Sequence, residues 1–210
     1  MAQADRQADL LAGGIEVLGL DVSAHQQQQL LAYVALLLKW NRAYNLTAMR
    51  DPAEMITRHL LDSLAVLPHV GAGALLDVGT GAGLPGLVLA ICRPDQAFTL
   101  LDSNGKKTRF ETQATLELGL PNVTVVQQRV EQYRSSFPQV CCRAFAALPD
   151  VLALCRHLLA PGGKLLAMKA HLAAQEQPPA GWRQASIALA VPSLDEVRQL
   201  LVLTREGDET

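Results

Sequence analysis

Apolar residues in the first part of the chain recur with the period of an α-helix. Between Leu30 and Leu38 they fall on one face at a spacing of 3.6 residues. Ser23 can cap this helix and Gln26 completes a capping box, so we expect the helix to continue to about Arg42. Further helices are expected over 5–18, interrupted at Gly13-Gly14, and from Asp51-Pro52 onward. The pattern predicts an N-terminal helical cap over residues 1–70.

From residue 71 the pattern changes to short apolar runs that alternate with helical segments. Strands are expected at 75–78, 96–101, 123–127, 140–143, 164–169, 187–191 and 197–204. Helices are expected at 85–92, 106–118 and 149–159, with one turn at 130–133. This alternation predicts an α/β domain over 71–210: a Rossmann-like, seven-stranded, mostly parallel sheet with an antiparallel pair at its edge.

A glycine-rich turn follows the first predicted strand. Asp77 stands at the strand's end, and glycines follow at positions 79, 81, 83 and 86. Residues 81–86 match the dinucleotide pattern G-x-G-x-x-G. Residues 77–83 instead resemble the first motif of S-adenosylmethionine-dependent methyltransferases, and a carboxylate suits the ammonium and sulfonium of that cofactor but repels a pyrophosphate. We therefore expect Asp77, Gly79 and Gly81 to bind S-adenosylmethionine; an NAD-type site and a purely structural turn are the alternatives.

Polar residues at the next two strand ends fit a nucleoside. Asp102 ends the second strand, where a carboxylate accepts hydrogen bonds from ribose hydroxyls. Val130 and Glu131 follow the third strand, where their backbone would lie beside adenine. The alternatives are a helix cap at Asp102 and a helix-start carboxylate at Glu131.

Arg143 ends the fourth strand, beside the expected methyl group. Amine-methylating nucleic-acid enzymes usually carry an Asn- or Asp-Pro-Pro-aromatic motif there, whereas this chain has residues 142–145, CRAF. Cys141 and Cys142 lack the Pro-Cys or Thr-Cys context of a cytosine-C5 nucleophile. Guanine N7 is an acceptor that needs neither base nor nucleophile, because its lone pair lies in the ring plane. Methyl transfer to N7 would depend on proximity and alignment of the reacting atoms. Arginine is also a good donor to guanine O6 and N7.

Composition bears on the partners of the chain and on its place in the cell. The 210 residues are 50% hydrophobic and carry a net charge of −2, so any nucleic-acid contact has to come from a local basic patch. The four cysteines form no C-x-x-C pair, which favours buried, reduced thiols and no metal site. No apolar run is long enough for a membrane span, and the polar N-terminus is unlike a signal peptide. We expect a cytoplasmic protein with no membrane contact.

Other segments with charged or aromatic residues allow both a functional and a structural interpretation. The stretch 39–47 mixes Trp40 and Tyr44 with cations, which suits either RNA stacking or packing against the sheet. Arg58 and Asp62 stand four residues apart, as in a surface ion pair, and His59 is expected to be a structural histidine. The basic cluster 106–109 is either a phosphate contact or a solvated helix face.

Four segments together resemble one known family. They are 38–63, LKWNRAYNLTAMRDPAEMITRHLLDS; the glycine loop DVGTGAGLPG; 100–107, LLDSNGKK; and 143–148, RAFAAL. This combination is similar to the RsmG (GidB) family of bacterial methyltransferases, which place a methyl on guanine N7 of 16S rRNA in the decoding region. The resemblance spans about 22–204 and implies a class I methyltransferase fold with S-adenosylmethionine as cofactor.

The resemblance also implies site residues and partners. Cofactor contacts of the family fall on Gly79, Leu84, Val130, Glu131 and Arg143. Our candidates for RNA or guanine contacts and catalysis are Arg143, Arg129 and Lys169. The expected partner is 16S rRNA in the small ribosomal subunit, and we expect a monomer.

The chain departs from the family's usual pattern at three places. They are Gln139 in place of an aspartate, Glu111-Thr112 in place of leucine and arginine, and Ala170 in place of glycine. These departures bear on substrate positioning more than on methyl transfer. The alternative functions are a methyltransferase for another acceptor, an NAD-dependent protein and a non-catalytic RNA-binding protein.

Overall fold

The computed structural model describes residues 2–143, 147–170 and 178–207, and it centres on one seven-stranded sheet of order β3-β2-β1-β4-β5-β7-β6. The strands are β1 (Leu75–Val78), β2 (Phe98–Asp102), β3 (Val123–Gln127), β4 (Phe137–Arg143), β5 (Leu159–Lys169), β6 (Trp182–Leu189) and β7 (Arg198–Arg205). β1 to β5 run parallel, whereas β7 pairs antiparallel with both β5 and β6. The predicted α/β sheet with an antiparallel edge pair is confirmed.

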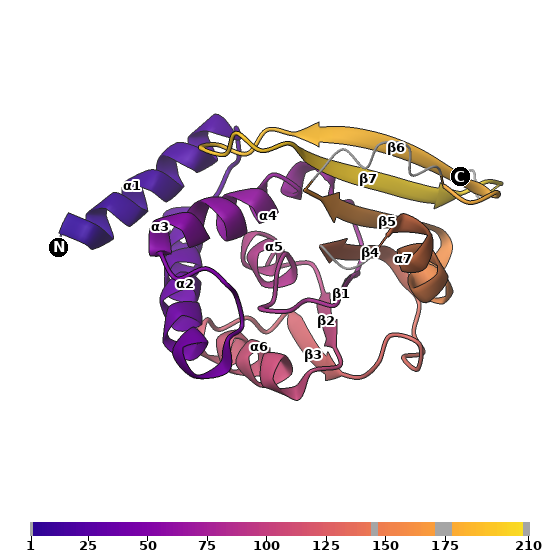
Figure 1. Ribbon diagram of the computed structural model, residues 1–210, viewed down its shortest axis with the longest axis horizontal. Coiled ribbons are helices and arrows are strands. Elements are labelled where there is room, and N and C mark those ends of the chain that lie inside the picture. The colour runs from indigo at the N-terminus through magenta and orange to yellow at the C-terminus, as the bar shows by residue number, and fades with distance from the viewer. Residues whose placement is uncertain (1, 144–146, 171–177, 208–210) are drawn as a thin grey trace.

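The helices cover the two faces of the sheet unequally. They are α1 (Ala2–Val17), α2 (Ala24–Tyr44), α3 (Pro52–Met55), a π-helical segment (Ile56–Leu61), α4 (Asp62–Leu64), a 3₁₀ turn (Leu67–His69), α5 (Gly86–Cys92), α6 (Gly105–Glu117), α7 (Leu148–Cys155) and a second 3₁₀ turn (Arg156–Leu158). In Figure 1, α1 to α6 lie on one side of the sheet and α7 on the other. The N-terminal helices therefore pack on the same face as α5 and α6. Among the described residues, no helix combines the length and apolar character needed to cross a membrane.

Alternation along the strands sends side chains into two separate hydrophobic clusters. Leu75 and Cys141 pack into the cluster shared with the N-terminal helices, whereas Leu76 and Cys142 pack into the α7 cluster. Both cysteines are buried, and burial raises the pKa of each thiol well above its ordinary value. Neither cysteine is available as a nucleophile.

The capping box of α2 forms as expected, but α1 differs from its prediction. Ser23 Oγ accepts from Gln26 N at 3.3 Å, and Gln26 Oε1 accepts from Ser23 N at 2.9 Å. The expected interruption at Gly13-Gly14 is wrong, because α1 runs through both glycines. A Cβ on Gly14 would lie 2.5 Å from Leu61 Cδ1, so this glycine lets α1 approach the π-helical segment closely.

Several boundaries also differ from their predictions. β4 begins at Phe137, and the helix expected over 149–159 ends at Cys155, followed by a 3₁₀ turn. The Pro161-Gly162-Gly163 turn lies inside β5, beside a register shift in its pairing with β4. β6 spans Trp182–Leu189 as the edge strand, where mostly solvent-accessible positions give a weak hydrophobic signal. The part of the 143–148 motif at 144–146 lies outside the described residues.

Gln139, the first departure from the family's pattern, ties the linker before β1 to the sheet. Its Nε2 donates to the carbonyls of Gly71 at 2.9 Å and Ala72 at 3.1 Å, and its Oε1 accepts from Gly71 N at 2.7 Å. Gln139 stands near the start of β4, whereas Arg143 ends that strand. This departure is therefore structural and lies away from the carboxyl ends of the strands.

Candidate functional site

Two neighbouring cavities open where the parallel strands end, and Arg143 lines both. We call them the β1–β3 cavity and the β5–β7 cavity. The β1–β3 cavity is lined by Val78, Gly79, Leu101, Asp102, Ser103, Lys107, Gln128, Arg129, Val130, Glu131, Arg143 and Leu154. The β5–β7 cavity is lined by Met49, Arg58, His59, Asp62, Arg143, Met168, Lys169, Ala170, Leu189, Arg198 and Gln199. Ligands of open α/β sheets bind at this edge.

Asp102 organises the glycine loop at the β1–β3 cavity. Its Oδ2 accepts from Gly81 N at 3.1 Å, and its Oδ1 accepts from Asn104 N at 2.8 Å. Lys107 Nζ lies 3.5 Å from Oδ2. Gly79 and Gly81 hold φ angles of 67° and 66°, which favour glycine and leave backbone accessible to a ligand. The structure thus brings Gly79, Asp102, Val130, Glu131 and Arg129 of the sequence candidates to one cavity.

Asp77 lies behind the glycine loop and does not line either cavity. Its Oδ2 accepts from Gly86 N at 2.8 Å, and its Oδ1 has no hydrogen-bond partner in the described part of the chain. Burial raises the pKa of Asp77 to about 7, although the Gly86 N–H and Arg143 oppose the shift. Gly81 and Leu84 also stand outside the cavity linings, and Leu84 is buried. Asp77 and Leu84 therefore support the glycine loop from its buried side, whereas Gly81 is part of the loop.

Glu111, the second departure, is a buried carboxyl that the sequence reasoning did not assign to the site. It accepts from the hydroxyl of Thr80, the residue between Gly79 and Gly81. Its Oε2 finds no partner within the described residues. Burial is the largest cause that raises the pKa of Glu111 to about 8. The hint in the sequence was the departure itself, an acidic residue where the family usually has an apolar one.

This carboxyl makes stability depend on pH. The folded state holds the Glu111 proton more tightly than the unfolded chain, so the free energy of unfolding falls as pH rises from about 4.5 to about 8. Glu111→Gln removes this titration while keeping an oxygen for Thr80. We expect the free energy of unfolding of the variant, relative to that of the parent, to rise by about 3 kcal/mol between pH 5 and pH 8 in urea unfolding, because one pKa unit corresponds to about 1.4 kcal/mol. Glu117→Gln, on the exposed face of the same helix, is the control. A difference independent of pH would contradict the assignment.

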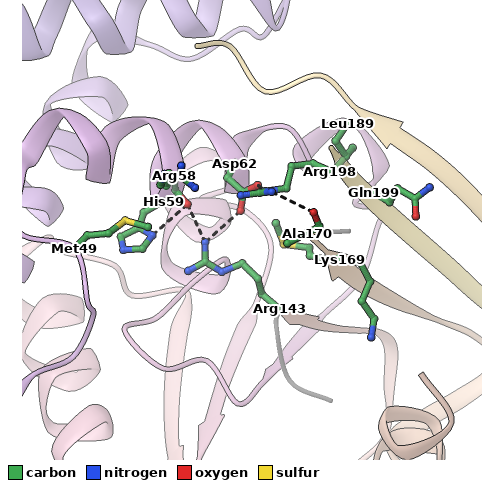
Figure 2. Close-up of a pocket in the computed structure, with 11 residues that line it drawn as sticks. Met49, Arg58, His59, Asp62, Arg143, Lys169, Ala170, Leu189, Arg198 and Gln199 are labelled. Carbon is green, nitrogen blue, oxygen red and sulfur yellow. Dashed lines mark hydrogen bonds and ion pairs between the residues drawn. The ribbon is translucent and has the colours of Figure 1, made fainter. Parts of the chain in front are cut away.

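The β5–β7 cavity is built from segments far apart in the sequence. Met49, His59 and Asp62 come from the N-terminal region, Arg143 from the end of β4, and Arg198 from the start of β7. Figure 2 shows the guanidinium of Arg143 pointing toward Asp62 and the backbone of Arg58, with Lys169 directed away from them. The N-terminal region therefore forms one wall of the candidate site.

The expected surface ion pair between Arg58 and Asp62 is wrong. Asp62 is buried, and its oxygens face Arg143 Nη1 at 3.3 Å and Arg198 Nε at 3.1 Å. Arg58 instead contacts Glu54 at 3.3 Å and Glu196 at 2.5 Å. The helix is π-helical over Ile56–Leu61, so the spacing rule of an α-helix does not hold between Arg58 and Asp62.

A family model described as GidB, rRNA small subunit methyltransferase G, matches residues 26–201. The "Ribosomal RNA small subunit methyltransferase G" of Shewanella amazonensis is 51% identical over 203 residues, which cover 94% of this chain and 98% of the relative. The protein of the same name from Chromohalobacter salexigens is 59% identical over 167 residues, covering 79% and 80%. This chain belongs to the GidB family.

A solved structure shows the fold independently. A SAM-dependent methyltransferase from Aquifex aeolicus superposes with a TM-score of 0.55 at 19% identity, over 79% of this chain and 96% of that one. The predicted class I methyltransferase fold is confirmed.

His59 is a neutral structural histidine at the rim of the β5–β7 cavity. Its Nδ1 donates to the Arg58 carbonyl at 3.2 Å, which leaves Nε2 to accept from the Thr47 hydroxyl at 3.0 Å. Burial lowers the pKa of His59 to about 4, and Arg143 adds to the shift. The histidine thereby fixes the loop that carries Met49 into the cavity.

The remaining cations and aromatic residues divide between the cavities and the core. Arg129 lines the β1–β3 cavity and Lys169 the β5–β7 cavity. Trp40 stacks on Tyr44 at 5.2 Å and meets Phe110 edge-on at 5.8 Å. These contacts favour the packing interpretation of Trp40, while Tyr44 stays partly exposed.

Proposed function

We propose that this GidB-family chain transfers the methyl group of S-adenosylmethionine to N7 of a guanine in 16S rRNA of the small ribosomal subunit. The observation that carries the proposal is the family membership, together with two cavities that share Arg143 as a common wall. A cofactor in one cavity and an acceptor in the other would meet at this residue.

The residues of the β1–β3 cavity fit S-adenosylmethionine. Gly79 and Gly81 would leave room for its amino acid end, with Leu84 supporting the loop and the unpartnered oxygen of Asp77 behind it. Asp102 would accept from the ribose hydroxyls, and the backbone of Val130 and Glu131 would read the adenine edge. When bound, the cofactor supplies an electrophilic methyl group. All these roles are proposals drawn from the family resemblance and the cavity lining.

The acceptor guanine would enter the β5–β7 cavity beside Arg143. Met49 and Met168 offer apolar contact to a planar base, and Arg143 offers donors to its O6. The N7 lone pair needs no deprotonation, so the protein's task is alignment of N7 with the methyl carbon and sulfur. Arg129 and Lys169 would bind flanking RNA, and the cluster at 106–109 would contact phosphates. We propose that the chain acts as a monomer in the cytoplasm.

Transfer of labelled methyl from S-adenosylmethionine tests the function. Separate pools of small subunits, large subunits, tRNA and protein come from cells that lack this enzyme, so that the site is unmodified. We expect label at one guanine of 16S rRNA, mapped by cleavage at N7-methylguanine. Label in another pool would retain the fold and cofactor and overturn the acceptor. S-adenosylmethionine binding without any label would overturn the reaction.

A further inference from the structure

Asp62 is a buried carboxylate held between two arginines that come from different strands. Its Oδ2 lies 3.3 Å from Arg143 Nη1, and its Oδ1 lies 3.1 Å from Arg198 Nε. The Asp62 side chain keeps only 6% of its accessible surface, while those of Arg143 and Arg198 keep 21% and 12%. Both oxygens are thus committed to guanidinium groups, and Asp62 acts on the site through them.

Arg198 uses its donors to hold the frame of the cavity together. Besides Asp62, it donates to Glu196 at 3.0 Å and to the Val197 carbonyl at 3.2 Å. A longer contact of 3.5 Å reaches the carbonyl of Ala170, the third departure from the family's pattern. Arg198 therefore anchors the carboxylate of Asp62 between the end of β5 and the start of β7.

Within residues 2–143, 147–170 and 178–207, the side-chain hydrogen bonds of Arg143 all come from Nη1. Its Nη1 donates to Asp62 and also to the Arg58 carbonyl at 3.2 Å. That carbonyl belongs to the π-helical segment and also accepts from His59. Among the described residues, no hydrogen bond uses Nε or Nη2 of Arg143. Because Arg143 lines both cavities, these donors are candidates for contact with a ligand there.

We propose that Asp62 is a positioning residue, which fixes the guanidinium plane of Arg143 so that Nε and Nη2 face the acceptor base. This inference rests on the proposed methyl transfer, because the base is the ligand of those donors. The carboxylate has a second effect: it compensates the partly buried charge of Arg143, whereas Arg198 also has Glu196 as a partner. With Nη1 anchored, the Nε and Nη2 donors of Arg143 lie in one fixed plane. Such donors favour a planar acceptor, as a base is.

Two Asp62 variants separate charge from position. Asp62→Asn removes the charge at nearly unchanged volume, and Asp62→Glu keeps the charge but moves the carboxylate by one methylene. For both we expect kcat for methyl transfer to small subunits to fall at least 10-fold, with the dissociation constant for S-adenosylmethionine within threefold of the parent. Glu54→Gln, which removes a different carboxylate from the same ion-pair cluster, should leave kcat within twofold.

Coupling to Arg143 distinguishes positioning from a merely structural role. In an Arg143→Ala background, Asp62→Glu should lower kcat no further, because the residue through which it acts is gone. Kcat within twofold of the parent for Asp62→Glu, or a full additive loss in the double variant, would overturn the proposal.

A readout without any acceptor keeps this inference separate from the proposed function. In ¹⁵N spectra of arginine side chains, anchoring of Nη1 should slow rotation of the Arg143 guanidinium and give separate Nη signals. Exchange between these signals should be faster in Asp62→Asn, where Nη1 keeps the Arg58 carbonyl but loses its charged acceptor, and unchanged in Glu54→Gln. Absence of methyl transfer by the parent would overturn the function alone, whereas identical Arg143 signals in parent and Asp62→Asn would overturn the positioning role.

Discussion

Replacement of Arg143 by alanine is expected to lower methyl transfer at least 100-fold while the protein stays folded. Arg143 lines both cavities, so its loss removes a donor from the place where cofactor and acceptor would meet. A charge-assisted hydrogen bond aligned with a reacting base contributes about 1.5–3 kcal/mol, and misalignment adds to that cost. The measurement is kcat/KM with small ribosomal subunits and labelled S-adenosylmethionine.

Stability should change much less than activity in this variant. Asp62 keeps its contact with Arg198 at 3.1 Å, so the buried carboxylate is not left without a cation. We expect a loss of about 1–2 kcal/mol in the free energy of unfolding. Arg6→Ala, the same change at an exposed position on α1, serves as the control for both measurements. Activity within threefold of the parent, or a loss of activity explained by unfolding, would contradict the role of Arg143.

The fold was predictable because most of its parallel strands are short, mainly apolar runs bounded by turns. β1 inside the sheet and β3 at its edge have the predicted bounds, Leu75–Val78 and Val123–Gln127, since each is a short run rich in apolar residues. β6 was misplaced because a half-exposed edge strand carries little hydrophobic signal. The continuity of α1 through Gly13-Gly14 was missed because Gly14 serves a close approach to Leu61, which lies far along the chain and gives no local sign.

The candidate site was predictable where strand ends place residues and not where tertiary pairing does. Asp102 ends β2 and Arg143 ends β4, the two strands on either side of β1, so their meeting near the glycine loop that follows β1 is a consequence of the topology. Asp62 lies 81 residues from Arg143 and 136 from Arg198, and the helical spacing rule pointed instead to Arg58. Only the π-helical turn and the packing of β7 bring the three together.

Replacement of Asp102 by alanine is expected to weaken S-adenosylmethionine binding at least 100-fold. The substitution removes the proposed ribose acceptor and also the carboxylate that accepts from Gly81 N and Asn104 N, so the glycine loop loses its anchor. Two charge-assisted hydrogen bonds at about 1.5 kcal/mol each correspond to a dissociation constant about 100-fold higher. Calorimetric titration of the cofactor measures the effect directly, without an RNA substrate.

Two further variants locate the origin of that loss. Asp102→Asn keeps an oxygen for the backbone N–H groups but loses the charge, so its affinity should fall between those of the parent and Asp102→Ala. Asp95→Ala changes an exposed aspartate in the turn before β2 and should leave the affinity unchanged. Lys107 lies 3.5 Å from Asp102, so part of the affinity lost in Asp102→Ala comes from the unpaired Lys107 cation. Adding Lys107→Met to Asp102→Ala should recover that part of the affinity and no more. Parent-like affinity in Asp102→Ala would place the ribose elsewhere and reassign the β1–β3 cavity.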